Sequence, residues 1–216
     1  HCWGMTETSP IGTINRPLAK HYGQSFSERL DVAVKQGRPV YGVEIKITDE
    51  NDITLPNNGK DFGNLWIRGP WICSGYLNIE KSETHGEDDW FMTGDVATID
   101  EDGFMQITDR TKDVIKSGGE WISSIEIENF AVGHPSVMEA GVIGVFHPKW
   151  DERPLLIIVK NENAKVSKEE ILDFLKDKIV SWWMPDDVVF VESLPHTATG
   201  KIQKLALREQ FKDYKF

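Results

Sequence analysis

Residues 109–119, with the sequence DRTKDVIKSGG, combine five charged side chains with a pair of glycines. Arg110 supplies a rigid fork of hydrogen-bond donors, whereas Lys112 and Lys116 supply mobile point charges. A glycine pair lets the backbone turn freely and come close to a phosphate group. The segment is therefore a candidate for phosphate binding and for a pivot between two parts of the chain. The alternative is a polar hairpin between two strands.

Residues 3–8, with the sequence WGMTET, place four different chemical groups next to one another. Trp3 offers a flat aromatic face, Gly4 lets the backbone approach a ligand closely, and Thr6 and Glu7 bring a hydroxyl and a carboxylate. Such groups can stack a base, contact a phosphate oxygen and hold a hard cation such as Mg²⁺. The alternative is an ordinary loop.

A third candidate is Asp95, which follows a glycine at the end of a strand-like run. An ionised carboxylate has two acceptor oxygens, so Asp95 can bind both hydroxyls of a ribose. The alternative is that Asp95 stabilises its own turn through a hydrogen bond to the backbone.

The fourth candidate is Lys201, at the end of the loop-forming sequence LPHTATGK in residues 194–201. A lysine on a glycine-containing loop can be delivered to a phosphoryl or carboxylate oxygen. The alternative is a simple connection into the last helix. The six histidines of the chain show no spacing typical of metal ligands.

The first half of the chain must position residues 3–8 and Asp95 mainly with strands. Short apolar runs alternate there with turn residues, and the turn at 100–103 (DEDG) predicts a hairpin. The expected strands are residues 41–47, 63–67, 91–99 and 104–108. Several strands at such close spacing predict a small distorted barrel or a sandwich.

The second half predicts alternating helices and strands. Ser123 with Glu126, and Ser167 with Glu170, have the spacing of capping boxes that begin helices. Further elements are expected as strands at 137–146, 155–160 and 188–191 and as a final helix from about Lys204. The fold class is therefore α+β, with a β-rich part followed by a smaller α+β unit.

Composition limits the function. The net charge of -11 argues against binding nucleic acid, which requires clustered Lys and Arg. Two cysteines without a CxxC pattern suit a reducing cytoplasm. No apolar run is long enough for a transmembrane segment, and no signal peptide is evident. Because residue 1 is His rather than Met, we expect the chain to be cut from a longer protein.

Together, the four candidate stretches resemble, in order and rough spacing, the adenylate-forming superfamily of acyl-CoA synthetases, luciferases and peptide-synthetase adenylation domains. Residues 109–124 and the sequence WWMPDD at 182–187 are most similar to medium- and long-chain fatty-acyl-CoA ligases. The resemblance covers essentially the whole chain.

The resemblance implies roles at the start of the chain. Trp3 would lie beside adenine in place of the usual tyrosine, with Gly4 next to it in the AMP site. Thr6 would contact the phosphate and Glu7 would ligate Mg²⁺, so that both take part in catalysis.

It also implies roles for the later charged residues. Asp95 would hold the ribose hydroxyls, assisted by Arg110. Lys112 would lie at the hinge, and Lys116 on a strand that faces the active site in the second half-reaction. Lys201 would be the catalytic lysine that stabilises carboxylate and phosphate oxygens during adenylation.

The same resemblance assigns a CoA-binding segment and a reaction. The CoA-facing residues would be Ser117, Gly118, Gly119, Glu120 and Trp121. A fatty acid would react with ATP to give acyl-AMP and pyrophosphate, and CoA would then release AMP. Residues 1–111 would belong to the large domain and 112–216 would form the small mobile domain, which rotates between the steps.

The chain departs from the family pattern because the Ser/Thr/Gly-rich phosphate loop and the acyl pocket are missing. We therefore expect a C-terminal portion that is inactive alone and requires the N-terminal part of the same protein. Alternatives are a luciferase-like or peptide-synthetase enzyme and a noncatalytic binding module. A cytoplasmic location, with peripheral membrane association as an alternative, is expected. The oligomeric state is open, with a homodimer as one alternative.

Overall fold

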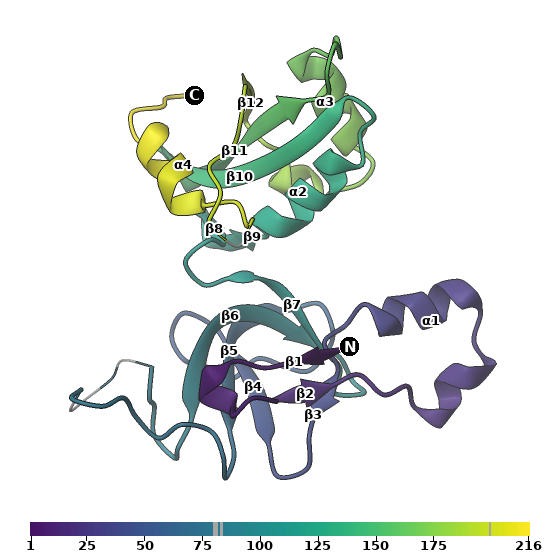
Figure 1. Ribbon diagram of the computed structural model, residues 1–216, viewed down its shortest axis with the longest axis vertical. Helices are drawn as coiled ribbons and strands as arrows, with labels where there is room; N and C mark the ends of the chain where they lie inside the picture. Colours follow the sequence, from purple (N-terminus) through teal and green to yellow (C-terminus); the bar gives the residue numbers. More distant parts are fainter. Residues whose placement is uncertain (80–81, 83, 199) are drawn as a thin grey trace. The chain divides into compact units, whose positions relative to one another are not determined.

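The computed structural model describes residues 1–79, 82, 84–198 and 200–216. It divides into two compact units, His1–Thr111 and Lys112–Phe216 (Figure 1). The units are described separately below.

The first unit contains two antiparallel sheets. A three-stranded sheet has the order β1-β2-β3 and a four-stranded sheet has the order β4-β5-β6-β7. The strands are β1 (Cys2–Trp3), β2 (Thr13–Ile14), β3 (Arg38–Pro39), β4 (Glu44–Thr48), β5 (Phe62–Arg68), β6 (Phe91–Ile99) and β7 (Met105–Arg110). The helices are η1 (Thr6–Thr8), η2 (Ala19–Gly23) and α1 (Phe26–Ala33).

The expected small barrel is not closed in the described residues, because other backbone segments occupy both edges of the four-stranded sheet. Leu55 donates its N–H to Ile47 O on β4 at 2.9 Å. At the other edge, Gly37 pairs with Met105 on β7. This second pairing needs glycine: Gly37 has a φ of +99°, and a Cβ there would lie 2.2 Å from Asn15 N. The sheet is therefore open.

Alternating inward-facing apolar side chains on the strands form the core of the first unit. Ile47, Leu65, Ala97 and Ile99 are buried together, and Trp3 packs against this group. The turn between β6 and β7 forms as the sequence predicts. There the Asp100 carboxylate accepts the N–H groups of residues 102 and 104 at 3.0 and 2.9 Å.

The second unit has one mixed sheet with helices on both faces. The sheet order is β10-β11-β8-β9, and β12 runs parallel to β11. The strands are β8 (Ile115–Ser117), β9 (Glu120–Ile122), β10 (Val137–His147), β11 (Asp151–Lys160) and β12 (Asp187–Val191). The helices are α2 (Ser124–Val132), α3 (Lys168–Leu175), η3 (Ser181–Trp183) and α4 (Lys204–Gln210).

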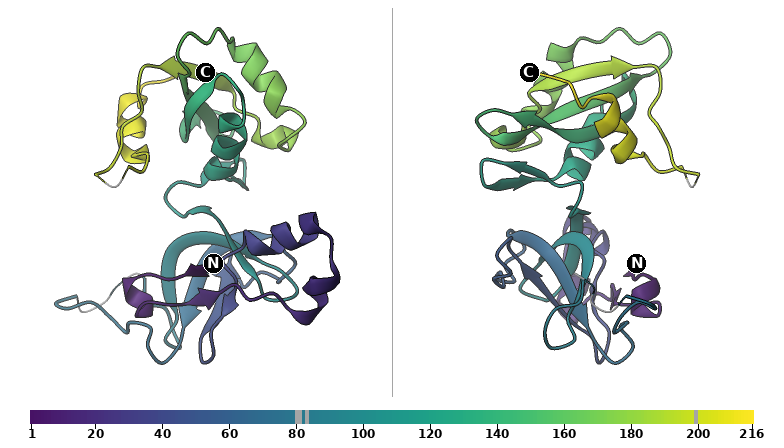
Figure 2. Two further views of the ribbon diagram at one scale, coloured as in Figure 1. Left: turned by 45° about the vertical axis from the view of Figure 1, so that its right-hand side comes forward. Right: turned by 90° about the vertical axis from the view of Figure 1, so that its left-hand side faces the viewer.

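The uninterrupted apolar run in β11 has a simple cause. Leu156 and Ile158 pack with α2 and α3, whereas Leu155, Ile157 and Val159 pack on the α4 side. Figure 2 shows α4 on the opposite face of the sheet from α2 and α3. A strand that is covered on both faces needs apolar side chains at every position.

The expected helix starts are confirmed. Ser123 and Ser167 each accept the N–H of the residue three positions later, at 3.2 Å. The α+β class is confirmed as well. In the part of the chain that the structure describes, no helix is long and apolar enough to cross a membrane.

Candidate functional site

Asp95 lies at the centre of a polar cluster in the first unit. Strand pairing places it directly opposite Arg110, on β6 and β7 respectively. Arg110 Nε is 3.0 Å from Asp95 Oδ1, and Trp3 Nε1 donates to Asp95 Oδ2 at 3.2 Å. The Asp95 residue is only 4% exposed. The structure thus brings together three predicted ligand-binding residues that are distant in the sequence.

Hydrogen bonds hold the backbone of Asp95 as well as its carboxylate. The Asp95 N–H donates to Thr93 Oγ1 at 3.1 Å, and that hydroxyl donates to Leu65 O at 3.0 Å. Burial raises the pKa of Asp95, while Arg110 and the indole N–H of Trp3 act in the opposite direction. The result is a fixed carboxylate with further lone pairs for hydrogen-bond donors.

The glycines beside this cluster have clear packing roles. A Cβ on Gly4 would lie 1.8 Å from Pro10 O, so only glycine allows the two backbones to approach this closely. Gly94 has a φ of +77°, and its carbonyl accepts the Thr111 N–H at 3.0 Å. The backbone on both sides of the cluster is therefore fixed by glycine.

Glu7 and Thr6 lie on η1. Tyr76 OH donates to Glu7 Oε1 at 2.9 Å, and the Cys73 N–H donates to Glu7 O at 2.9 Å. Burial, followed by the bond to Glu7, raises the pKa of Tyr76. Thr6 is exposed, and the adjacent Thr8 is buried and accepts the Met5 N–H.

A single carboxylate such as Glu7 suits Mg²⁺. This ion is usually bound through one or two carboxylates, water and substrate phosphates rather than by an all-protein cage. Among the described residues there is no group of three or more His, Cys, Asp and Glu side chains that could hold a metal. The donor set therefore fits an ion shared with a phosphate-bearing substrate.

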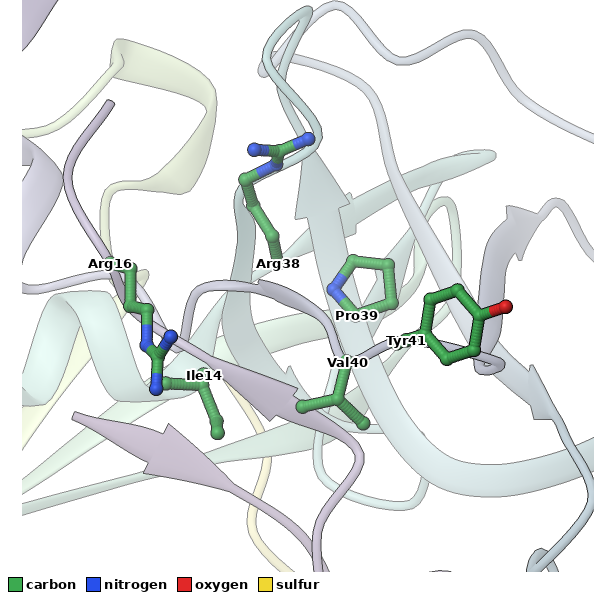
Figure 3. Close-up of a pocket in the computed structure, with 6 residues that line it drawn as sticks. All are labelled: Ile14, Arg16, Arg38, Pro39, Val40 and Tyr41. Carbon is green, nitrogen blue, oxygen red and sulfur yellow. The ribbon is translucent and has the colours of Figure 1, made fainter. Parts of the chain in front are cut away.

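A separate pocket of about 420 Å³ lies next to β2 and β3 (Figure 3). Two guanidinium groups, from Arg16 and Arg38, and the ring of Tyr41 line it together with apolar side chains. None of its lining residues was predicted as a site residue.

In the second unit, the β8–β9 hairpin carries the predicted segment 117–121. Gly118 has a φ of +59° and donates its N–H to Trp150 O at 2.8 Å. A Cβ on Gly118 would lie 2.9 Å from the Trp150 ring, whereas one on Gly119, with a φ of +86°, would meet open space. The hairpin turn is therefore tightly packed on one side and open on the other.

Side chains next to the turn are mostly exposed. Glu120 and Lys116 are exposed, and Lys116 Nζ lies 5.6 Å from the centre of the Trp121 ring. Ser117 is fully buried. The hairpin thus alternates between side chains that anchor it and side chains that face solvent.

Lys112 is the first residue of the second unit and lies in a turn over residues 111–113. This turn separates Lys112 from β8, the strand that carries Lys116. The Lys112 side chain is exposed.

Lys201 is exposed on the loop before α4. The loop is folded on itself: Thr197 N–H donates to Lys201 O at 2.8 Å, and Lys201 N–H donates to Thr197 Oγ1 at 3.2 Å. His196 contacts Glu139 on β10 at 3.2 Å. The loop therefore lies beside β10, whereas β8 joins the sheet at β11. Thr199, part of the same predicted motif, lies outside the described residues.

Sequence reasoning did not find two residues that support these sites. Tyr76 bonds to Glu7 across 69 positions, and no local pattern marks it. The other is Arg153, whose NH1 atom donates a hydrogen bond to Ser117 Oγ at 3.2 Å. The only available signal was the charged stretch 151–153, which precedes the apolar run of β11.

Comparisons with known proteins cover both units. A family model described as AMP-binding enzyme matches residues 1–77, and the AMP-binding enzyme C-terminal domain matches residues 126–201. A 3-methylmercaptopropionyl-CoA ligase from Ruegeria pomeroyi is 54% identical over 213 residues, covering 99% of this chain. A medium-chain-fatty-acid–CoA ligase from Ectopseudomonas oleovorans is 52% identical over 213 residues, again covering 99% of this chain.

A solved structure agrees with these relatives. The ATP-bound crystal structure of MatB from Rhodopseudomonas palustris matches 99% of this chain with a TM-score of 0.81 and 33% identity. The chain spans 39% of the length of the two curated relatives and 41% of the MatB chain.

Proposed function

The chain belongs to the adenylate-forming superfamily of AMP-binding enzymes, and from that premise we propose that it is the C-terminal part of an ATP-dependent acid–CoA ligase. In the first half-reaction, a carboxylate oxygen of the acid attacks the α-phosphorus of ATP, and pyrophosphate leaves. In the second, the CoA sulfur attacks the acyl carbonyl carbon, AMP leaves and the thiol loses its proton.

The observation that carries this proposal is the Asp95 cluster. A buried carboxylate that is held by Trp3 and Arg110 can accept both ribose hydroxyls of the nucleotide. Arg110, whose side chain is 55% exposed, extends from the cluster into solvent and can also contact the ribose. Because Trp3 gives its N–H to Asp95, its ring position is fixed before the adenine binds.

Thr6 and Glu7 complete the nucleotide site in this proposal. Thr6 contacts the α-phosphate with its exposed hydroxyl, and Glu7 supplies a carboxylate oxygen for Mg²⁺. When bound, Mg²⁺ would neutralise negative charge on the phosphates. Tyr76 holds Glu7 through the Oε1 atom, which orients this carboxylate.

The second unit supplies different groups to each half-reaction. Lys201 stabilises the negative charge that develops on carboxylate and phosphate oxygens during adenylation. Residues 117–121, with Lys116 before them, bind CoA during thioester formation. Lys112 is the proposed hinge, because it is the first residue of the second unit and lies in an exposed turn.

The substrate we propose is a fatty acid or a short carboxylic acid with a similarly apolar chain. We propose that the reaction takes place in the cytoplasm. The names of the two curated relatives, a medium-chain fatty acid in one and 3-methylmercaptopropionate in the other, support this class.

The first test measures ATP–pyrophosphate exchange. We expect exchange from the complete ligase that contains these 216 residues and none from the 216-residue chain alone. Exchange by the chain alone would overturn the proposed division of the active site.

The second test offers the complete ligase CoA, amines and a carrier protein as acceptors. Thioester formation with CoA is the expected result. Preferential transfer to another acceptor would instead support a peptide-synthetase-like enzyme.

A further inference from the structure

Arg153 makes an unusually complete set of interactions for an arginine outside the proposed active site. It is 6% exposed. Its Nε donates to Asp186 Oδ1 at 2.8 Å, and its NH1 donates to Trp182 O at 2.9 Å and Ser117 Oγ at 3.2 Å. Its NH2 donates to Met184 O at 3.0 Å. One guanidinium group therefore ties the β8 strand to the segment 182–186.

The same residues define the position of Gly118. A Cβ added to Gly118 would meet Trp150 at 2.9 Å and Trp182 at 3.4 Å, so the turn rests against both indoles. These two rings pack edge to face with centroids 4.9 Å apart. The Arg153 guanidinium lies 4.9 Å from the centre of the Trp182 ring. Arg153 thus supports both the strand before Gly118 and one wall against which Gly118 packs.

The interactions of Arg153 fix the relative positions of two segments in addition to neutralising its charge. A buried arginine with one carboxylate partner would satisfy its charge, as Asp186 already does here. The other three bonds go to Ser117 and to two backbone carbonyls on a different segment, and a planar fork of donors fixes their relative positions.

We propose that Arg153 is a positioning residue for the thioester-forming half-reaction. It holds Ser117 and Gly118 in register against the Trp182–Asp186 segment, and so sets the wall along which the CoA arm passes. It acts through these residues and touches neither CoA nor the acyl group. This inference rests on the proposed function of residues 117–121.

The kinetic test uses Arg153→Met and Arg153→Lys in the complete ligase. Acyl-adenylate formation is followed by pyrophosphate exchange, and thioester formation is followed from supplied acyl-adenylate. We expect Arg153→Met to lower the thioester rate by about 10- to 100-fold, the loss typical of a misplacement near 1 Å, and to leave exchange unchanged. Arg153→Lys keeps the charge beside Asp186 but loses the fork, so its thioester rate should be intermediate.

Two further variants guard against a folding defect. Ser117→Ala removes a single acceptor without leaving a buried charge, and we expect a smaller loss in the same half-reaction. Lys168→Met removes an ion pair to Asp187 in the same unit without touching β8, and both half-reactions should be retained.

A structural readout is independent of activity. In the 216-residue chain, the amide resonance of Gly118 should shift in Arg153→Lys and stay in place in Lys168→Met. Wild-type thioester rates in a folded Arg153→Met variant, or equal losses in both half-reactions for Arg153→Lys, would overturn the inference. If the wild-type ligase itself forms no adenylate or thioester, the proposed function fails. In that case the Gly118 resonance alone tests the inference about Arg153. A resonance that does not shift in Arg153→Lys would refute the positioning role.

Discussion

Replacing Asp95 with Asn separates nucleotide binding from stability. The change keeps the shape of the side chain but removes the charge that Trp3 and Arg110 contact at 3.2 and 3.0 Å. The amide oxygen can still accept from Trp3, so Arg110 is the partner that loses its acceptor. Because the Arg110 side chain is 55% exposed, water can replace that contact.

The expected effect on folding is small. An ion pair with one solvent-exposed partner contributes at most about 1 kcal/mol. Against this loss, Asn avoids the cost of burying a charge at a site that is 4% exposed. We expect the free energy of unfolding to change by no more than about 1 kcal/mol and the Tm by no more than about 5 °C.

The contribution of Asp95 to the free energy of unfolding depends on pH, with a sign that follows from its pKa shift. Burial raises the folded-state pKa of Asp95, so the folded protein binds this proton more tightly than the unfolded chain does. The contribution of Asp95 to stability is thus fully present below its unfolded pKa of about 3.9 and is lost as the pH rises through the folded pKa. Relative to Asp95→Asn, the wild type should therefore become more stable as the pH falls through that interval.

The effect on nucleotide binding should be large. Hydrogen bonds to a charged group contribute about 1.5–3 kcal/mol, so losing the carboxylate should weaken ATP binding by the complete ligase about 10- to 150-fold. Calorimetric titration measures this affinity, and urea denaturation of the 216-residue chain from pH 4 to 8 measures stability.

Asp100→Asn is the matched control. Asp100 lies one position beyond β6 and pairs with Lys35 at 2.6 Å, but it stabilises the hairpin turn that follows the strand, whereas Asp95 lies in the middle of β6. It should leave ATP affinity unchanged. Wild-type ATP affinity in Asp95→Asn, or a loss of stability above about 2 kcal/mol at pH 7, would refute the reasoning.

Two other predictions concern single contacts in the 216-residue chain. Gly4→Ala places a Cβ 1.8 Å from Pro10 O and should destabilise the first unit by about 1–3 kcal/mol. Gly23→Ala is the control, because a Cβ there meets open space and should change stability much less. Urea denaturation compares the two variants. Tyr214→Phe removes a bond to Asp187 and should cost about 1–2 kcal/mol at pH 8, discounted for partial exposure. Because burial, followed by that bond, raises the pKa of Tyr214 to about 12, the difference from wild type should disappear as the pH rises from about 10 through 12; a constant difference would contradict this assignment.

Local patterns predicted most elements because their signals lie within a few residues. The Ser167–Glu170 box begins α3, and the turn at Asp100 joins β6 to β7. The same logic could have located α1, which Ser25 and Glu28 cap in this way but which was not predicted. Local patterns could not predict whether the four-stranded sheet closes into a barrel, because that depends on which distant segments pair with the edges of the sheet.

The candidate site was predicted residue by residue but not as a set of contacts. Sequence suggested that Trp3 offers an aromatic face, yet its indole N–H binds Asp95 across 92 positions. Likewise, the charge of Arg153 gave no indication that four acceptors from two segments surround it. Such contacts arise from tertiary packing and have no periodic or local signature.

The most direct test of the account is the Lys201→Ala variant of the complete ligase, assayed for both half-reactions. If the second unit supplies Lys201 to adenylation alone, ATP–pyrophosphate exchange should be lost while supplied acyl-adenylate and CoA still yield thioester at the wild-type rate. Full ATP–pyrophosphate exchange in this variant, or equal loss of both half-reactions, would contradict the proposal that Lys201 acts in adenylation alone.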